Sequence, residues 1–185
     1  MDYNPVYFEA DPKVKLGHQR QRVITSPIFS ASFCSKSPLK NLKSPGTHTT
    51  AQKLGKRYEA KVLAKSNALA KWTALKSPWL QYIDSEGTHF CQPDLLLTNK
   101  NLILLCEIKL THTSAAFFQM EKLYRPVLRR IFPEHKILSV EITRSFDPSI
   151  RFPQEMLLYF SIEDLLLNST PSSNVNTISV LQWKL

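Results

Sequence analysis

Two short apolar runs joined by a polar turn constrain this chain more than any other stretch of its sequence. Residues 95–97 form the first run, residues 98–101 form the turn, and residues 102–105 form the second run. Apolar runs of this length, bounded by turn residues, are typical of buried strands. We therefore predict a β-hairpin at this place, with both strands in the core of the protein.

Charged residues stand where the two predicted strands end. Pro93 and Asp94 come directly before the first run, and Glu107, Ile108 and Lys109 follow the second. Because successive strand residues point to opposite faces, the side chains of Glu107 and Lys109 share a face. An acid on one strand, followed by acid-x-Lys on the next, resembles the signature of the PD-(D/E)XK nuclease superfamily.

That resemblance implies a site for the hydrolysis of phosphodiester bonds. Asp94 and Glu107 would hold Mg²⁺ or Mn²⁺, with the backbone carbonyl of Ile108 as a further ligand, and Lys109 would assist the attacking water. Such cations prefer carboxylate and water oxygens, and a bound cation polarises a phosphoryl oxygen and makes a bound water more acidic. A hairpin with a Glu–Lys pair on a solvated face is the alternative.

A helix is predicted before the hairpin, from Thr49 or Thr50 to Leu75. Its apolar residues form one stripe, and Lys53, Lys56 and Arg57 lie away from that stripe. Glu59 is the only acid in this helix and lies beside the stripe. Superfamily nucleases commonly carry a glutamate on this helix, so the resemblance implies that Glu59 completes the site as a metal or metal-water ligand. A salt bridge within the helix is the alternative.

A second helix is predicted after the hairpin, from about Ala115 to Arg130. Pro126 lacks a backbone N–H and is expected to kink or divide this helix. In RecB-type exonucleases of the superfamily the corresponding helix carries a glutamine and, four residues later, a tyrosine. Here Tyr124 follows Gln119 by five residues, which predicts that the two side chains diverge. Gln119 is then expected to face the site, and Tyr124 is expected to belong to the core.

The predicted fold is α/β, with a mixed central β-sheet flanked by helices; the resemblance makes it a restriction-endonuclease-like nuclease core over residues 49–185. Residues 1–48 are predicted to be a basic, Pro/Ser-rich arm with little core of its own. The other predicted elements are strands at 77–84, 89–97, 136–143 and 156–162, a short helix at 163–167, and an edge strand or packed segment at 178–183.

Positive charge is concentrated in the first part of the chain. Residues 1–76 hold fourteen Lys and Arg against four acids, and the remainder holds ten against eleven. Basic surfaces bind the phosphate backbone without reading sequence. DNA is the expected partner, contacted by Lys53, Lys56, Arg57 and Lys122. The arm is expected to wrap its own domain, to reach a protein partner or second subunit, or to lie along nucleic acid; a solvated tail is the alternative.

The composition also narrows the class of protein. The longest apolar run, residues 102–106, is too short to span a membrane, and the N-terminus lacks a signal-peptide pattern. A soluble, cytoplasmic protein is expected. The three cysteines, Cys34, Cys91 and Cys106, show no paired spacing, which argues against a disulfide framework, a zinc site or an iron–sulfur cluster.

The leading hypothesis is a Mg²⁺-dependent deoxyribonuclease, with exonuclease and endonuclease action both open. One alternative is a nucleic-acid-binding or partner-binding module that has the nuclease fold but no turnover. The other is a structure-selective or transposase-associated endonuclease that acts as a dimer.

Overall fold

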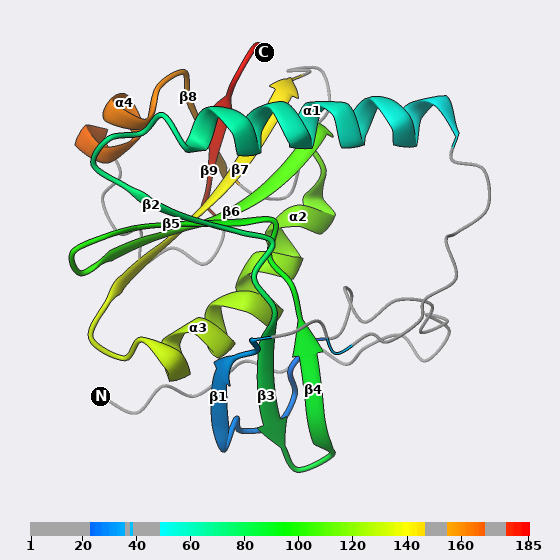
Figure 1. The fold of residues 1–185 in the computed structure, drawn as a ribbon, viewed down its shortest axis with the longest axis vertical. Helices are drawn as coiled ribbons and strands as arrows, with labels where there is room; N and C mark the ends of the chain where they lie inside the picture. The colour runs from blue at the N-terminus through cyan, green and yellow to red at the C-terminus, as the bar shows by residue number, and fades with distance from the viewer. Residues whose placement is uncertain (1–22, 36–37, 39–48, 147–154, 169–176) are drawn as a thin grey trace.

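A computed structural model describes residues 23–35, 38, 49–146, 155–168 and 177–185 of the chain (Figure 1). They form an α/β protein with a six-stranded mixed sheet and a smaller three-stranded antiparallel sheet. In chain order the elements are β1 (Ser30–Phe33), α1 (Thr50–Ser66), β2 (Thr73–Lys76), β3 (Leu80–Asp84), β4 (Gly87–Cys91), β5 (Leu95–Asn99), β6 (Leu102–Thr111), α2 (Ser114–Gln119), the π-helical turn η2 (Met120–Tyr124), α3 (Arg125–Ile131), β7 (Lys136–Ser145), β8 (Glu155–Tyr159), α4 (Ile162–Asn168) and β9 (Thr177–Gln182).

The six-stranded sheet has the strand order β2-β5-β6-β7-β9-β8. Strand β5 runs antiparallel to both β2 and β6, whereas β6, β7, β9 and β8 run parallel to their neighbours. The two longest strands, β6 and β7, lie side by side in its middle. Their near-continuous apolar sequences suit strands that are covered on both faces.

Helices cover the two faces of this sheet: in Figure 1 the sheet lies between α1 above and α2 and α3 below. Tyr58 and Val62 of α1 pack with Leu104 and Cys106 of β6, and the buried residues of α2, η2 and α3 pack on the side of Leu105. Alternate residues of a strand face opposite ways. Even-numbered residues of β6 therefore face α1, and odd-numbered residues face α2 and α3.

The small sheet, in the order β1-β3-β4, projects from the body and includes part of the predicted arm (Figure 1). Strand β1 pairs antiparallel with β3, so residues 30–33 belong to the fold. The same segment contacts the helices, because the Ile24 N–H donates to the Lys122 carbonyl at 3.2 Å and Arg130 donates to the Phe29 carbonyl at 2.8 Å. Most of the rest of the predicted arm lies outside the described residues.

Several predicted elements differ in the structure: the predicted strand 77–84 begins at Leu80, and the predicted strand 156–162 ends at Tyr159 and is followed by α4 from Ile162. The first helix ends at Ser66 instead of Leu75, and residues 73–76 form β2, paired with β5. The predicted strand 89–97 is two strands in different sheets, because Pro93 cannot donate to a ladder and restricts the residue before it. The last segment lies between β7 and β8 as β9, so it is an interior strand and not an edge strand. Within the described residues, no helix is both long and apolar enough to cross a membrane.

The packing of the sheet can be tested with two leucines. Leu105 is fully buried, whereas the side chain of Leu167 on α4 is 85% exposed. Leu105→Ala removes buried methyl groups and leaves a cavity, so we expect it to lower the free energy of unfolding by about 2–5 kcal/mol in urea denaturation. Leu167→Ala is the matched control and should change it by less than about 0.5 kcal/mol. Equal effects of the two substitutions would contradict this packing.

Candidate active site

Three carboxylates lie side by side near the middle of the two central strands, where the neighbouring strand β5 begins. Glu107 on β6 pairs in register with Glu141 on β7. Asp94 directly precedes Leu95, which pairs with Cys106, and its carboxylate accepts from the Ile108 N–H, so Asp94 lies beside Glu107. Neighbouring strands are about 4.8 Å apart, and side chains that are opposite each other share a face. Asp94, Glu107 and Glu141, here called the carboxylate row, are buried, with exposed fractions of 8%, 2% and 0%.

Asp94 is held by the strand that carries Glu107. The Ile108 N–H donates to Asp94 Oδ2 at 2.8 Å, and the Ser77 N–H donates to the Asp94 carbonyl at 2.8 Å. In a strand, the N–H and C=O of one residue point toward the same neighbouring strand. The carbonyl of Ile108 therefore faces the side on which the Asp94 carboxylate lies.

Lys109 forms an ion pair with Glu107, and its Nζ lies 2.6 Å from Glu107 Oε1. Both residues lie on the odd-numbered face of β6, as the alternation of the strand predicts. Burial alone would lower the pKa of Lys109, but the carboxylates of Glu107, Asp94 and Glu141 outweigh burial and raise that pKa above its ordinary value. Lys109 is therefore a cation at neutral pH.

Sequence reasoning did not include Glu141 in the site. Its Oε1 accepts a hydrogen bond from the Thr113 N–H at 3.1 Å, and its Oε2 lies 2.6 Å from Nδ1 of His112, which is also buried. The signal in the sequence was an acid inside the apolar strand 136–143. Its meaning depended on the register between β6 and β7, which local periodicity does not contain.

The prediction that Gln119 and Tyr124 diverge is wrong. Gln119 Nε2 donates to the Tyr124 hydroxyl across the π-helical turn η2. In a π-helix each N–H bonds to the carbonyl five residues earlier, so residues five apart come onto one side of the helix. Pro126 divides the helix as expected, since it has no N–H to donate to the Lys122 carbonyl. The Ile24 N–H bonds to that carbonyl instead.

The Gln119–Tyr124 pair is bonded to the segment just before strand β5. The Tyr124 hydroxyl donates to the Gln92 carbonyl at 3.0 Å, and Gln92 stands two residues before Asp94. Tyr124 is buried in the core and also makes this polar link. Gln119, the last residue of α2, is thus linked through Tyr124 to the segment that precedes β5.

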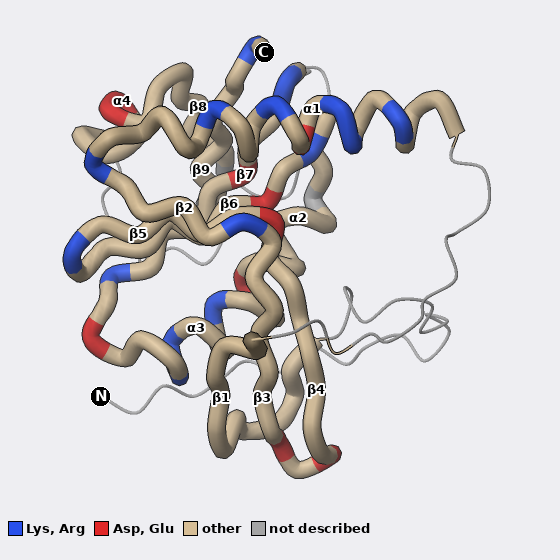
Figure 2. Tube along the Cα trace, in the orientation of Figure 1, with Lys and Arg blue, Asp and Glu red and all other residues tan. Residues whose placement is uncertain are grey.

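Glu59 stands outside the carboxylate row. It is half-buried on α1, and α1 covers the opposite face of the sheet through Tyr58 and Val62. Its role in a metal site stays a prediction. Lys53, Lys56 and Arg57 are exposed on the same helix, and Figure 2 shows basic residues distributed along α1. Lys122 is half-buried in η2.

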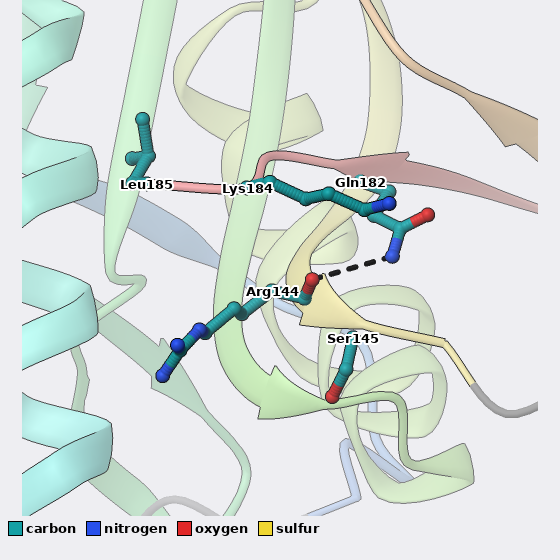
Figure 3. Close-up of a pocket in the computed structure, with 5 residues that line it drawn as sticks. All are labelled: Arg144, Ser145, Gln182, Lys184 and Leu185. Atoms are coloured by element: carbon teal, nitrogen blue, oxygen red, sulfur yellow. Dashed lines mark hydrogen bonds between the residues drawn. The ribbon is translucent and has the colours of Figure 1, made fainter.

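A hollow at the ends of β7 and β9 adds basic residues that sequence reasoning missed. It is lined by Arg144, Ser145, Gln182, Lys184 and Leu185 (Figure 3). Arg144 directly follows Thr143, the residue of β7 that pairs with Lys109. Figure 3 shows its side chain extending away from Gln182 and toward the side of α1. Burial raises the pKa of Tyr58 on α1, and the charge of Arg144 opposes that rise, which agrees with this direction.

The donor set at Asp94 suits a hard divalent cation. Among the described residues, no three His, Cys, Asp or Glu side chains are close enough to hold a metal ion together. A cation at this place would therefore be held by the carboxylates of Asp94 and Glu107, the carbonyl of Ile108, and water. All of these ligands are oxygens, as Mg²⁺ and Mn²⁺ prefer.

Comparison with protein-family models finds no family that matches this sequence, and comparison with curated proteins finds no matching relative. The candidate active site is accordingly defined by its own residues and their geometry.

The ion pair of Lys109 with Glu107 leads to a pH-dependent prediction. In EDTA, we expect Lys109→Met to lower the free energy of unfolding by about 1.5–3 kcal/mol, the range for hydrogen bonds to charged groups. The folded pKa of Lys109 is raised. Its stabilising contribution is therefore complete below the unfolded value of about 10.4 and is lost as pH rises through the folded value.

Denaturant unfolding at pH 7, 9 and 11 measures this difference. The gap between wild type and Lys109→Met should be the same at pH 7 and 9 and should narrow at pH 11. Lys100→Met changes an exposed lysine in the β5–β6 turn and serves as the control. A gap that is absent at pH 7, or that widens at pH 11, would contradict the ion pair.

Proposed function

We propose that this protein is a metal-dependent nuclease that hydrolyses phosphodiester bonds of DNA. The observation that carries the proposal is the burial of Asp94 and Glu107 side by side, with the Lys109 ammonium 2.6 Å from Glu107. Two such carboxylates can hold a metal ion that assists attack on a phosphodiester, and a nearby lysine ammonium can stabilise the charge that develops.

The order of elements supports a restriction-endonuclease-like fold of the PD-(D/E)XK type. Helix α1 precedes the antiparallel strands β2, β5 and β6, and α2, η2 and α3 then lead to β7, which is parallel to β6. Helix, antiparallel strands, helix and parallel strand follow in the order that this superfamily would have. The hairpin β3–β4 is then an insertion between β2 and β5.

Asp94, Glu107 and the carbonyl of Ile108 would hold the cation. When bound, Mg²⁺ supplies a polarised phosphoryl oxygen and a more acidic water. Lys109 remains protonated beside these groups, so its ammonium can orient the attacking water or stabilise the negative charge that develops on the phosphoryl oxygens. Glu107 restrains the ammonium at this place, and the rest of Lys109 is half-buried along the strand.

The exposed face of α1 is the proposed contact with the DNA backbone. Lys53, Lys56 and Arg57 stand on that helix without an acid in its first turn. Arg144 extends toward the same helix from the end of β7 (Figure 3). These cations would neutralise phosphates and release counterions, a mode of binding that depends on salt and not on base sequence.

Cleavage of labelled linear and circular DNA, single- and double-stranded, tests the catalytic part of this proposal. With Mg²⁺ or Mn²⁺ we expect cleavage by the wild type that stops in EDTA. Asp94→Asn and Lys109→Met should each reduce the rate by about a hundredfold or more, because each removes a charged group at the reacting phosphate. Cleavage of circular as well as linear DNA would indicate endonuclease action, and cleavage of linear DNA alone would indicate exonuclease action.

The control for these variants is Glu134→Gln, which changes an exposed acid in the segment between α3 and β7. It should cleave at the wild-type rate. If no DNA substrate is cleaved in a metal-dependent way but salt-sensitive DNA binding persists, the nuclease proposal fails and a nucleic-acid-binding module takes its place.

The salt dependence of DNA binding tests the role of α1. For each phosphate contact removed from Lys53, Lys56 or Arg57 by alanine, the slope of log K against log salt should become less steep by about one. Fluorescence anisotropy with duplex DNA between low and moderate salt measures the slope. Lys100→Ala, in the turn at the other end of the hairpin, is the matched control. Unchanged slopes for all three α1 variants would place the DNA elsewhere.

A further inference from the structure

Glu141 is an acid with no exposed surface whose two carboxylate oxygens both contact the same short segment. Oε1 accepts from the Thr113 N–H at 3.1 Å, and Oε2 lies 2.6 Å from His112 Nδ1. The imidazole of His112 also lies near Phe146, with ring centroids 6.1 Å apart. Residues 112 and 113 connect the end of β6 to the start of α2.

This segment separates two residues of the candidate active site. Lys109 lies three residues before His112 on β6, and Gln119 is the last residue of α2. The far end of the helix is attached as well, because Gln119 bonds to Tyr124 and Tyr124 bonds to the Gln92 carbonyl. The helical segment is therefore fixed on both sides of Glu107, to β7 through Glu141 and to the connection before β5 through Gln92.

A purely structural role explains Glu141 poorly. Residues that share its face of β7, Ser139 and Thr143, are buried but uncharged, so Glu141 is the charged residue among them. Taking a carboxylate out of water costs free energy even where partners are present, so a buried carboxylate at this place indicates a role other than stability. Its position in the carboxylate row, next to Glu107, supplies one.

We propose that Glu141 is a positioning residue of the candidate active site: through His112 and Thr113 it fixes the end of β6 and the start of α2, and so sets Lys109 and Gln119 relative to Glu107. The inference rests on the proposed nuclease function, and it names a residue outside the Asp94, Glu107 and Lys109 motif. Glu141 need not touch DNA or the metal to act in this way.

Two substitutions at Glu141 separate positioning from other roles. Glu141→Ala removes both contacts, and we expect kcat for DNA cleavage to fall by about 10- to 100-fold, because small misplacement of reacting groups has large effects on rate. KM should stay within about twofold, since the exposed basic residues that bind DNA are unchanged. Glu141→Gln keeps an oxygen for Thr113 and a polar group for His112, so it should retain most of the activity.

His112 gives a second pair of variants in case Glu141→Ala does not fold. His112→Asn keeps an amide near the place of Nδ1 and should be close to wild type, whereas His112→Leu should lower kcat. Ser139→Ala is the matched control, because Ser139 is buried on β7 two residues before Glu141 and bonds to Arg125 instead. It should leave kcat unchanged.

Hydrogen exchange provides a readout that does not depend on cleavage. Glu141→Ala and His112→Leu should raise the exchange rates of amides 113–119 and leave those of α3 as in wild type. If the wild type cleaves no DNA but exchange changes in this pattern, the nuclease proposal fails and Glu141 still fixes α2. The positioning role would be overturned if Glu141→Ala and His112→Leu both kept the wild-type kcat. A change in KM alone, or a loss in Glu141→Gln equal to that in Glu141→Ala, would overturn it as well.

Discussion

The buried negative charge near the middle of the central strands β6 and β7 is the constraint on which the rest of this structure depends. A carboxylate taken out of water destabilises the fold unless hydrogen bonds and positive charge replace its hydration. The backbone N–H of Ile108 donates to Asp94, and the ammonium of Lys109 pairs with Glu107. Glu141 accepts from the Thr113 N–H and lies beside His112. Each of these donors comes from residues 108–113. The last residues of β6 and the two residues that follow it therefore supply a contact to each of the three acids.

The two faces of strand β6 differ in what they carry: one face is apolar along its length, and the other ends in charged and polar residues. On the face of α1, even-numbered residues of β6 up to Ile108 remain apolar and join the core with Tyr58 and Val62. On the other face the apolar residues stop at Leu105, and Glu107 and Lys109 follow. One strand can thus hold a helix firmly on one side and present charged groups on the other, because its side chains alternate.

The sequence was informative where the relevant geometry is local. The common face of Glu107 and Lys109 follows from strand alternation, and the division of the second helix follows from Pro126. The partnership of Glu107 with Glu141 was not predictable, since it depends on how two strands separated by a helix come into register. The Gln119 and Tyr124 prediction failed because it assumed α-helical spacing through a turn where proline had already removed an α-helical hydrogen bond.

The predicted C-terminal end of the first helix was wrong for a different reason. Leu69 and Trp72 continue the apolar stripe of α1, so periodicity alone extended the helix beyond Ser66. In the structure these residues are half-buried and pack against the core from the turn that leads to β2. Periodicity reports which residues are buried, and it does not report whether the chain between them remains helical.

The docking of residues 24–33 has a consequence for the order in which the chain can fold. Their partners are β3, the Lys122 carbonyl and Arg130, the last of which is separated from Phe29 by 101 positions. During synthesis at about 5–20 residues per second, this early segment waits roughly 5–20 s before its helical partners exist. Contacts between such distant positions also slow folding in the finished chain. The first described segment of the chain therefore cannot complete its native contacts until helices about a hundred positions later have been made.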